Sequence, residues 1–327
     1  MKKILITGGA GYIGSHCARI LADEGYEVVI IDNLVKGHIQ AIKDFKHYIG
    51  NIGDEDLVAK ILSENKIDGV MHFAAYSLVG ESMKMPYEYY SNNVGQTMSF
   101  LHSLIKQGVN NIVFSSTAAV YGQSDVSPIT EEVVLAPINT YGETKLTVEK
   151  MLKWFNIAYG LNYTSLRYFN VAGAYETGEI GEDHNPETHL IPVVLNVALR
   201  KSDKLKIFGG DYPTPDGTCI RDYIHVVDLI YAHIKAYEYM SAVNTSDIFN
   251  LGSGGGYSNL EILNTARKIT NCEIPADVEP RRPGDPPILI AASKKAEDIL
   301  NWKRKYDIND IIATAWKWKK SHPDGYK

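Results

Sequence analysis

Eight residues near the N-terminus constrain the fold of this chain more than any others. Residues 7–14 (TGGAGYIG) follow a short apolar run and precede a helical pattern. Gly8, Gly11 and Gly14 form a G-x-x-G-x-x-G frame, and Gly9 with the last two also satisfies G-x-G-x-x-G. Glycines at this spacing permit a tight strand-to-helix turn and a close approach of the backbone to a phosphate. The pattern predicts a turn that binds a dinucleotide pyrophosphate, although a merely tight turn would need the same residues.

The end of the second apolar run strengthens this interpretation. Residues 28–31 are followed by Asp32, 18 residues after Gly14. An acidic side chain at this place accepts hydrogen bonds from both ribose hydroxyls of an adenosine and repels a 2′-phosphate. The sequence therefore predicts NAD rather than NADP as the cofactor, and Lys36 is the one nearby residue that opposes this preference.

Short apolar runs alternate with helical patterns through the first half of the chain. The runs span residues 4–7, 28–31, 70–73, 112–115 and 164–169, and the helical patterns span residues 13–23, 55–62, 89–105 and 144–158. This order predicts an α/β fold with a doubly wound (Rossmann) parallel sheet, because continuously apolar strands are buried on both faces. Glycine, proline and aspartate become frequent after residue 170. We expect an NAD-binding domain over residues 1–170, with a strand returning near residues 248–251, and a smaller, loop-rich substrate domain over residues 171–327.

The composition excludes several classes of protein. The chain has 33 Lys and Arg against 39 Asp and Glu, a net charge of −6, so we expect no binding to nucleic acid or to a membrane surface. Cys17, Cys219 and Cys272 share no C-x-x-C spacing, which argues against a disulfide framework or a zinc site, and we expect no metal. No apolar run has the length of a signal peptide or a membrane span, which predicts a cytoplasmic location.

Further strand ends are expected to line the same crevice, since ligands of such sheets bind at the carboxyl ends of the strands. Phe73, Ala74 and Ala75 end one strand with small residues that let a ribose–phosphate chain pass close. Ser115 and Thr117 end the next strand and place hydroxyls near the nicotinamide. Packing of helices against the sheet is an equally good reason for any one of these residues.

Tyr141 and Lys145 form a Y-x-x-x-K pair about one helix and loop after the Thr117 strand end. Residues four apart share a helix face, so the lysine can support both the tyrosine and a cofactor ribose. A nearby ammonium is expected to lower the pKa of the phenol toward neutrality, which would make Tyr141 a proton acceptor for a hydroxyl that NAD oxidises. Thr117 could share that hydrogen bond. The same spacing recurs at Tyr231 and Lys235, which we interpret as a helix surface without chemistry.

These motifs are similar to those of the extended short-chain dehydrogenase/reductase family. The similarity includes residues 7–14, 32–34 (DNL), 72–82 (HFAAYSLVGES), 115–122 (SSTAAVYG), 166–173 (LRYFNVAG) and the pair Tyr141/Lys145. Residues 211–228 (DYPTPDGTCIRDYIHVVD) and 281–285 (RRPGD) more narrowly resemble the UDP-glucose 4-epimerases. The resemblance runs nearly end to end. It implies an isomerase of galactose metabolism that interconverts UDP-glucose and UDP-galactose through a 4-keto intermediate, with tightly bound NAD taking and returning the C4 hydride.

The motifs and the resemblance together assign roles to individual residues. Catalysis falls to Tyr141, Lys145 and Thr117. Cofactor contacts fall to Gly8, Gly11, Tyr12, Ile13, Gly14, Asp32, Asn33, Asn51, Ile52, Phe73, Ala74, Ala75, Asn92, Ser115, Tyr141, Lys145 and Phe169. UDP-sugar contacts fall to Thr117, Tyr141, Asn170, His189, Leu190, Lys206, Ile207, Phe208, Arg221, Tyr223, Arg282, Asp285 and Leu289.

Four positions depart from the pattern of the family. Asn51 stands where members commonly carry Asp beside the adenine, Ser77 replaces a Lys that reaches the pyrophosphate in some members, and His189 replaces an Asn near the nucleotide-sugar. Leu289 occupies a position beside the sugar C2 where enterobacterial members carry Tyr. A smaller side chain there leaves room for a 2-acetamido group, which implies activity on UDP-GlcNAc and UDP-GalNAc, unless Leu289 merely fills the pocket wall.

The substrate end has its own physical requirement. An acidic protein needs local cations to hold a pyrophosphate, and Arg221 and Arg282 lie in loop-rich segments where bidentate phosphate contacts are natural. An ion pair with Asp222 or Asp285 is the alternative role for these arginines.

Two other functions share parts of this pattern. A nucleotide-sugar 4,6-dehydratase would carry an Asp-Glu pair after Thr117, where this chain has Ala118 and Ala119. A non-enzymatic regulator that senses NAD would have little reason to keep Tyr141 and Lys145 together with the sugar-side arginines.

The resemblance also implies a homodimer. The helical patterns over residues 89–105 and 144–158 carry more apolar residues than one buried face requires. In the family these helices pair between subunits, and simple packing against the sheet is the alternative.

Overall fold

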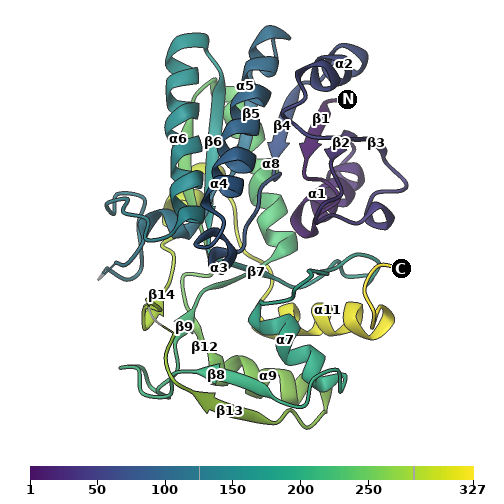
Figure 1. The fold of residues 1–327 in the computed structure, drawn as a ribbon. Helices are drawn as coiled ribbons and strands as arrows, with labels where there is room; N and C mark the ends of the chain where they lie inside the picture. The colour runs from purple at the N-terminus through teal and green to yellow at the C-terminus, as the bar shows by residue number, and fades with distance from the viewer. Residues whose placement is uncertain (125, 283) are drawn as a thin grey trace.

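A seven-stranded parallel sheet forms the centre of the computed structural model, which describes residues 1–124, 126–282 and 284–327 (Figure 1). Its strands are ordered β11-β6-β5-β4-β1-β2-β3. They span Lys3–Thr7 (β1), Glu27–Asp32 (β2), Lys46–Ile49 (β3), Gly69–His72 (β4), Asn111–Ser115 (β5), Asn162–Tyr168 (β6) and Asp247–Leu251 (β11). The order reverses between β1 and β4, as the doubly wound class requires, so the predicted fold class is confirmed.

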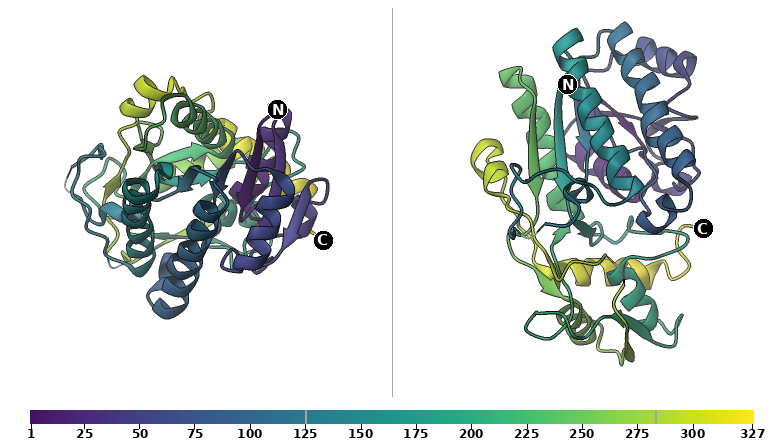
Figure 2. Two further views of the ribbon diagram at one scale, coloured as in Figure 1. Left: turned by 90° about the horizontal axis from the view of Figure 1, so that it is seen from above. Right: turned by 60° about the vertical axis from the view of Figure 1, so that its left-hand side comes forward.

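The strands are apolar on both faces because helices cover both sides of the sheet (Figure 2). In β1, Ile4 and Ile6 pack against one helical layer and Leu5 against the other. The first layer contains α1 (Tyr12–Asp23), α8 (Val226–Val243) and α10 (Lys294–Leu300), and the second contains α2 (Glu55–Asn65), α5 (Gln96–Lys106) and α6 (Thr140–Tyr159).

The predicted strands are all present, and the predicted return near residues 248–251 is β11, which pairs with β6. The helix expected over residues 89–105 is divided into α4 (Pro86–Tyr89), a π-helical segment η2 (Tyr90–Gly95) and α5. Edge strand β3 was not predicted, because its four residues are half-exposed or exposed and give no apolar run. Such turns are frequent at functional sites, and this one carries Asn92, an expected cofactor residue.

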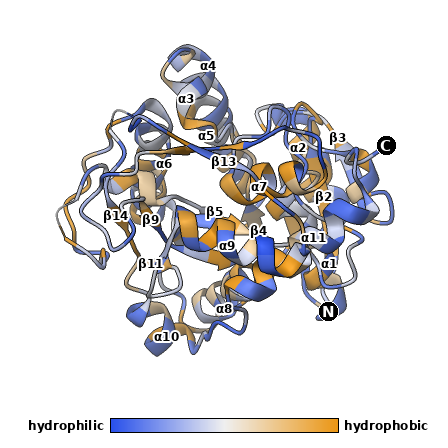
Figure 3. Cartoon of the chain, turned by 90° about the horizontal axis from the view of Figure 1, so that it is seen from below, coloured by the Kyte–Doolittle hydropathy of each residue, from blue (hydrophilic) through white to orange (hydrophobic). Residues whose placement is uncertain are grey.

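The smaller part of the molecule lies at the carboxyl-end side of the sheet (Figure 1). It holds β7 (Asn170–Ala172), α7 (Leu190–Ala198), β8 (Leu205–Phe208), β9 (Ile220–Arg221), β10 (Tyr223–His225), β12 (Tyr257–Ser258), α9 (Asn259–Thr270), β13 (Ala276–Glu279), β14 (Ile288–Leu289) and α11 (Ile308–Ser321). Helices α7, α9 and α11 enclose a separate hydrophobic cluster. Figure 3 shows α7 in the orange of hydrophobic residues. The chain returns from here to the sheet through α8 and β11, while a boundary at residue 170 stays a prediction.

The remaining short elements are η1 (Ile39–Ala41), α3 (Val79–Ser82) and η3 (Ala118–Tyr121). Among the helices of the described residues, none has the length and apolar character needed to cross a bilayer.

Candidate active site

The turn between β1 and α1 has no room for a side chain at Gly8, Gly9 or Gly14. A Cβ on Gly8, whose φ is +70°, would lie 2.6 Å from the backbone nitrogen of Ala74, and one on Gly14 would lie 2.1 Å from the Gly8 carbonyl oxygen. Gly11 caps α1 and has no side chain with which to accept from the first N–H groups of the helix. These donors and the bare backbone fit a pyrophosphate, which would approach the helix N-terminus directly.

Asp32 ends β2 beside this turn. Its side chain is 7% exposed, and its two oxygens accept hydrogen bonds from the backbone N–H groups of Ala10 (2.9 Å) and Leu34 (2.8 Å). Burial raises the pKa of Asp32, and these two hydrogen bonds oppose the shift. The fixed carboxylate keeps lone pairs free for the hydroxyls of a ribose, as the prediction of NAD requires.

Asn33 and Asn51 lie together next to Asp32, with Asn33 Nδ2 donating to Asn51 Oδ1 at 2.8 Å. Asn51 lines an open hollow of about 390 Å³ that also contacts Ser91 and Gln96. Asn92 lies on the π segment η2, and its Oδ1 accepts from Gln96 Nε2 at 3.2 Å. The remaining expected cofactor residues lie at strand ends or at the start of α1: Tyr12, Ile13, Ile52, Phe73, Ala74, Ala75, Ser115 and Phe169.

The three predicted catalytic residues meet where β5 ends and α6 begins. Asn139 caps α6 by accepting from the Gly142 N–H at 2.8 Å, which sets Tyr141 in the first helical turn. Thr117 follows β5 and lies close enough to the Tyr141 side chain to lower its pKa. One turn later, Lys145 is 3% exposed and its Nζ donates to the Ser115 carbonyl oxygen at 2.7 Å. The structure thus brings together side chains that the sequence separates by 28 residues.

The expected effect of Lys145 on Tyr141 is not met in this structure. Burial raises the pKa of Tyr141 to about 12, and the hydrogen bond with Thr117 only opposes that shift. The Lys145 Nζ lies 6.0 Å from the centroid of the tyrosine ring, and burial lowers the pKa of Lys145 to about 7 against the opposing charge of Glu149. Desolvation therefore outweighs the attraction between the two groups, and the prediction of a lowered tyrosine pKa was wrong for the chain alone.

A buried ion pair behind the catalytic residues was missed by the sequence analysis. Glu149 lies one turn beyond Lys145 on α6 and is 4% exposed. Its carboxylate accepts from Arg167 on β6, at 2.9 Å from Nε and 2.5 Å from Nη2, and from Ser116 Oγ at 2.5 Å. Arg167 also donates to the Tyr121 hydroxyl at 2.9 Å. The network ties the strand ends of β5 and β6 to the catalytic helix.

The predicted substrate residues come from separate elements of the smaller part. Four lie on short strands: Asn170 on β7, Arg221 on β9, Tyr223 on β10 and Leu289 on β14. Strand β8 carries Lys206, Ile207 and Phe208. The start of α7 carries His189 and Leu190, and the segment before β14 carries Arg282 and Asp285. Pro283, within the 281–285 motif, lies outside the described residues.

Several of these residues contact one another. The Arg282 guanidinium stacks 3.9 Å from the centroid of the Phe208 ring. Arg221 lies 3.6 Å from the Asp285 carboxylate, so the ion pair that we considered as an alternative role is formed. Leu289 pairs with Arg221 in the short sheet, and both Leu289 and Phe169 pack against a small buried cluster that includes Tyr121.

Others are not brought into that group. Lys206 is 60% exposed at its side chain and pairs with Glu279 at 3.4 Å, because alternation along β8 turns it away from the face of Ile207. Ile207 and Tyr223 are buried in the hydrophobic cluster of the smaller part, so packing accounts for their side chains. His189 holds its Nδ1 3.0 Å from carboxylate oxygens of both Glu182 and Glu187. Substrate roles for these residues stay predictions.

Comparison with known proteins agrees with this geometry. A family model described as the NAD dependent epimerase/dehydratase family matches residues 4–252. The UDP-glucose 4-epimerase of Lactobacillus helveticus is 55% identical over 99% of this chain and 99% of its own length. A crystal structure of UDP-glucose 4-epimerase from Brucella ovis in complex with NAD has a TM-score of 0.95 and 44% identity, covering 97% of this chain and 98% of that one. The enzyme of that name from Bifidobacterium longum, in complex with NAD+ and UDP, has a TM-score of 0.93 and 38% identity, covering 99% of this chain and 100% of that one.

Proposed function

Since this chain belongs to the NAD dependent epimerase/dehydratase family, we propose that Tyr141, Thr117 and Lys145 perform its reaction. The enzyme is an NAD-dependent isomerase that interconverts UDP-glucose and its C4 epimer, UDP-galactose. The observation that carries the assignment of residues is their meeting where β5 ends and α6 begins, at the same edge of the sheet as the glycine turn.

Tyr141 acts as the base for the sugar 4-hydroxyl. The acceptor is the phenolate, which forms when the phenol gives its own proton to solvent, and Thr117 lies beside it and favours this charged form. The phenol then returns this proton to the oxygen at C4 once the carbon has been reduced again. Bound NAD supplies the hydride acceptor, taking hydrogen from C4 and returning it to the opposite face of the 4-keto sugar.

Lys145 supports this proton transfer through its positive charge and through its position one helical turn from Tyr141. Its Nζ is anchored on the Ser115 carbonyl, one turn from Tyr141. With a pKa of about 7, the ammonium is partly charged at neutral pH and favours the phenolate that forms when the tyrosine loses its proton.

The residues after Thr117 argue against the dehydratase alternative. Ala118 is buried at the start of η3 and neither it nor Ala119 can move a proton at C5 or C6. The regulator alternative gives no reason for a buried lysine next to a tyrosine, since burial of that charge is costly without a chemical use.

The substrate side rests on two arginines. Arg221 is largely buried, with 14% of its side chain exposed, and Arg282 stacks on Phe208. Both can reach a pyrophosphate, and Arg221 would exchange its weak 3.6 Å contact with Asp285 for a bidentate phosphate contact.

Acceptance of N-acetylated sugars is a further proposal. Leu289 packs against the same small cluster as Phe169, an expected cofactor residue, and a leucine leaves more room than a tyrosine. We expect the wild type to interconvert UDP-GlcNAc and UDP-GalNAc as well, and Leu289→Tyr to lose that activity selectively. If wild type does not convert UDP-GlcNAc, or if the variant converts it equally well, Leu289 does not determine whether the site accepts a 2-acetamido group.

We also propose that the enzyme is a cytoplasmic homodimer that pairs through α5 and α6. Trp154, Ile157 and Tyr159 on α6 are 60–65% exposed, and Met98 on α5 is 53% exposed. The three thiols are unpaired, which suits a reducing compartment. Sedimentation equilibrium of wild type should give twice the chain mass, and Trp154→Glu should shift it toward the monomer, whereas a wild-type monomer would contradict the proposal.

An isotope experiment tests the proposed reaction. UDP-galactose deuterated at C4 of the galactose should give UDP-glucose that keeps the deuterium at C4 in ordinary water, because the same hydrogen leaves and returns. Release of the label into water, or a product that has lost the elements of water, would contradict C4 epimerisation.

A further inference from the structure

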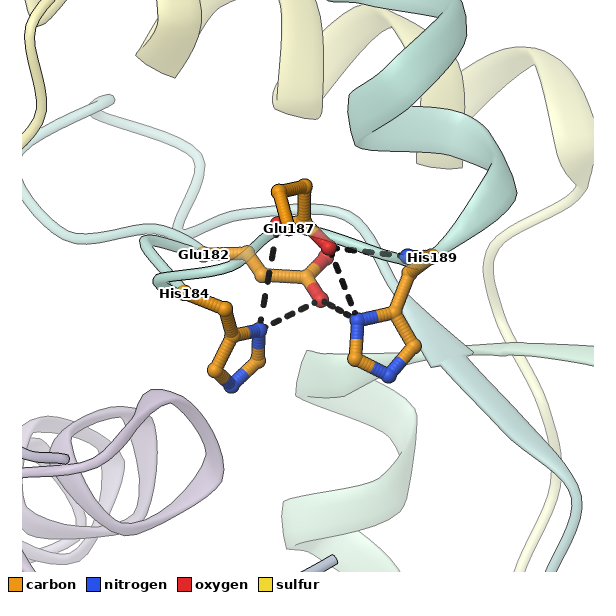
Figure 4. A group of neighbouring side chains, drawn as sticks. All are labelled: Glu182, His184, Glu187 and His189. Atoms are coloured by element: carbon orange, nitrogen blue, oxygen red, sulfur yellow. Dashed lines mark hydrogen bonds and ion pairs between the residues drawn. The ribbon is translucent and has the colours of Figure 1, made fainter. Parts of the chain in front are cut away.

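The loop between β7 and α7 gathers two carboxylates and two imidazoles within eight residues. These are Glu182, His184, Glu187 and His189, called here the 182–189 cluster. Figure 4 shows both histidine rings turned so that their Nδ1 atoms face the carboxylates. One ligand atom from each residue lies within 4.8 Å of all the others. His189 is the one member of this group that the sequence analysis expected at the UDP-sugar, and the proposed proton and hydride transfer uses none of the four.

The distances within the 182–189 cluster suit a small cation. In a tetrahedral zinc site with bonds of about 2.0–2.2 Å, neighbouring ligand atoms lie about 3.3–3.6 Å apart. The four imidazole-to-carboxylate distances are 3.0, 3.0, 3.1 and 3.8 Å. Three of them are slightly shorter than that spacing and one is slightly longer, and no two of the ligand atoms are more than 4.8 Å apart.

One carboxylate oxygen in the cluster lacks a hydrogen bond. Glu187 Oε2 is inaccessible to solvent and accepts no hydrogen bond from the described residues, while its side chain as a whole is only 10% exposed. The 3.8 Å that separates it from His184 Nδ1 is too long for a hydrogen bond. An unsatisfied buried carboxylate oxygen is costly, and a cation between these atoms would satisfy it.

The surroundings hold the cluster in place. The Glu182 carbonyl accepts from Trp318 Nε1 at 3.2 Å, and Glu187 Oε1 accepts from the backbone N–H groups of Thr188 and His189, both at 2.8 Å. The His184 ring lies edge-on to Tyr12 on α1, with centroids 6.2 Å apart. The 182–189 cluster therefore lies between the cofactor helix and the start of α7.

We propose that the 182–189 cluster binds one divalent transition-metal ion, with zinc as the preferred occupant. Two imidazole nitrogens and two carboxylate oxygens form a ligand set that suits zinc better than magnesium or calcium, which prefer oxygen ligands alone. The +2 charge of the ion balances the −2 charge of the two carboxylates. The site departs from our expectation of no metal, and its role is to fix the loop over residues 182–189 at the start of α7 rather than to take part in hydride or proton transfer.

The metal-free cluster is itself charged, so the ion competes with a proton. Burial would lower the pKa of His189, but hydrogen bonds to Glu182 and Glu187 outweigh it and raise the pKa to about 10. The pKa of Glu182 is lowered because its contacts with His184 and His189 outweigh burial. A bound cation takes the place of the proton between the same groups.

The test uses untagged, full-length protein that retains its NAD and has been dialysed against a chelator. Calorimetric titration with zinc alone should give one ion per chain. His184→Gln and Glu187→Gln should each weaken binding by about 100-fold or more. His102→Gln is the matched control, because His102 is exposed and also lies beside a carboxylate, 3.6 Å from Glu55, and it should bind zinc as wild type does.

A second measurement stands even if a variant fails to fold. Cobalt added to wild type should give the strong visible absorption of a tetrahedral ion, and zinc should displace it. Absence of saturable zinc binding to wild type would overturn the proposal. So would unchanged affinity in folded His184→Gln and Glu187→Gln, or a weak octahedral cobalt spectrum.

Discussion

Helices α6 and α8 carry the same Y-x-x-x-K spacing and use it differently. On α6, Lys145 is buried and anchored on the end of β5, where Thr117 reaches Tyr141. On α8, the Tyr231 hydroxyl donates to Glu24 at 2.9 Å, and the Lys235 side chain, 46% exposed, pairs with Glu238 at 2.8 Å. The second pair is a helix surface, as the sequence analysis interpreted it.

The tyrosines themselves do not distinguish the two pairs. Burial raises the pKa of both Tyr141 and Tyr231 to about 12, with Glu24 adding to the shift of the second. The lysines differ, because only one of them lies under the carboxyl ends of the strands, where the cofactor turn also opens. The comparison teaches that the position of the pair against the sheet, and not its spacing, creates the site.

The largest expected effect is on kcat, when each of the two tyrosines is replaced by phenylalanine. Tyr141→Phe removes the proton acceptor and should lower kcat by about 10²–10⁴-fold, while bound NAD and the circular dichroism spectrum stay as in wild type. Tyr231→Phe should leave kcat unchanged. Equal losses in the two variants, measured as initial rates on UDP-galactose, would remove the distinction between α6 and α8.

The next effect compares two glutamates. Glu149→Gln leaves the Arg167 charge buried without its partner and should lower the free energy of unfolding by about 3–5 kcal/mol. Glu238→Gln breaks only the exposed pair with Lys235 and should cost less than about 1 kcal/mol. Denaturant unfolding of both variants gives the comparison. Similar decreases in the free energy of unfolding would show that the buried pair stabilises the protein no more than the exposed pair does.

The smallest effect is a pH dependence that belongs to Lys145. Its pKa falls from 10.5 to about 7 on folding, so between these values the unfolded chain binds a proton that the folded chain lacks. The free energy of unfolding of wild type should therefore rise with pH in this window relative to Lys145→Met, by at most about 1.4 kcal/mol per pH unit. Below pH 7 both states are protonated, and the penalty for the buried charge is fully present.

Nucleotide-free protein and two pH values, 7 and about 9.5, suffice for that measurement. Lys235→Met is the control and should track wild type at both. A difference between wild type and Lys145→Met that does not change with pH would contradict the burial of this charge.

Much of the fold could be predicted because its strands are apolar on both faces. The runs that became β1, β2, β4, β5, β6 and β11 needed no knowledge of their partners. The edge strand β3 could not be recognised in this way, since its residues face solvent or half-buried surroundings. The interruption of the long helix by a π segment leaves no mark in the hydrophobic pattern either.

The site was predicted where local motifs carry it and missed where distant contacts do. Gly8, Asp32 and Tyr141 belong to fixed spacings, whereas the Glu149–Arg167 pair joins a helix to a strand 18 residues away. Burial explains the wrong prediction for the pKa of Tyr141, because a sequence shows which charges are near along a helix but not how much water they lose. The 182–189 cluster lies in a loop whose folding brings its four ligand atoms together.

The most direct test of the central claim needs only wild-type protein, UDP-galactose and no added NAD. After incubation, the nucleotide-sugars are separated by chromatography, and the protein is denatured to release what it holds. The account predicts UDP-glucose as the product and NAD released from the protein, because the cofactor is regenerated in each turnover and Tyr141 returns the proton it took. Unchanged UDP-galactose, activity that appears only with a large excess of NAD, or a 4-keto-6-deoxy product would contradict it.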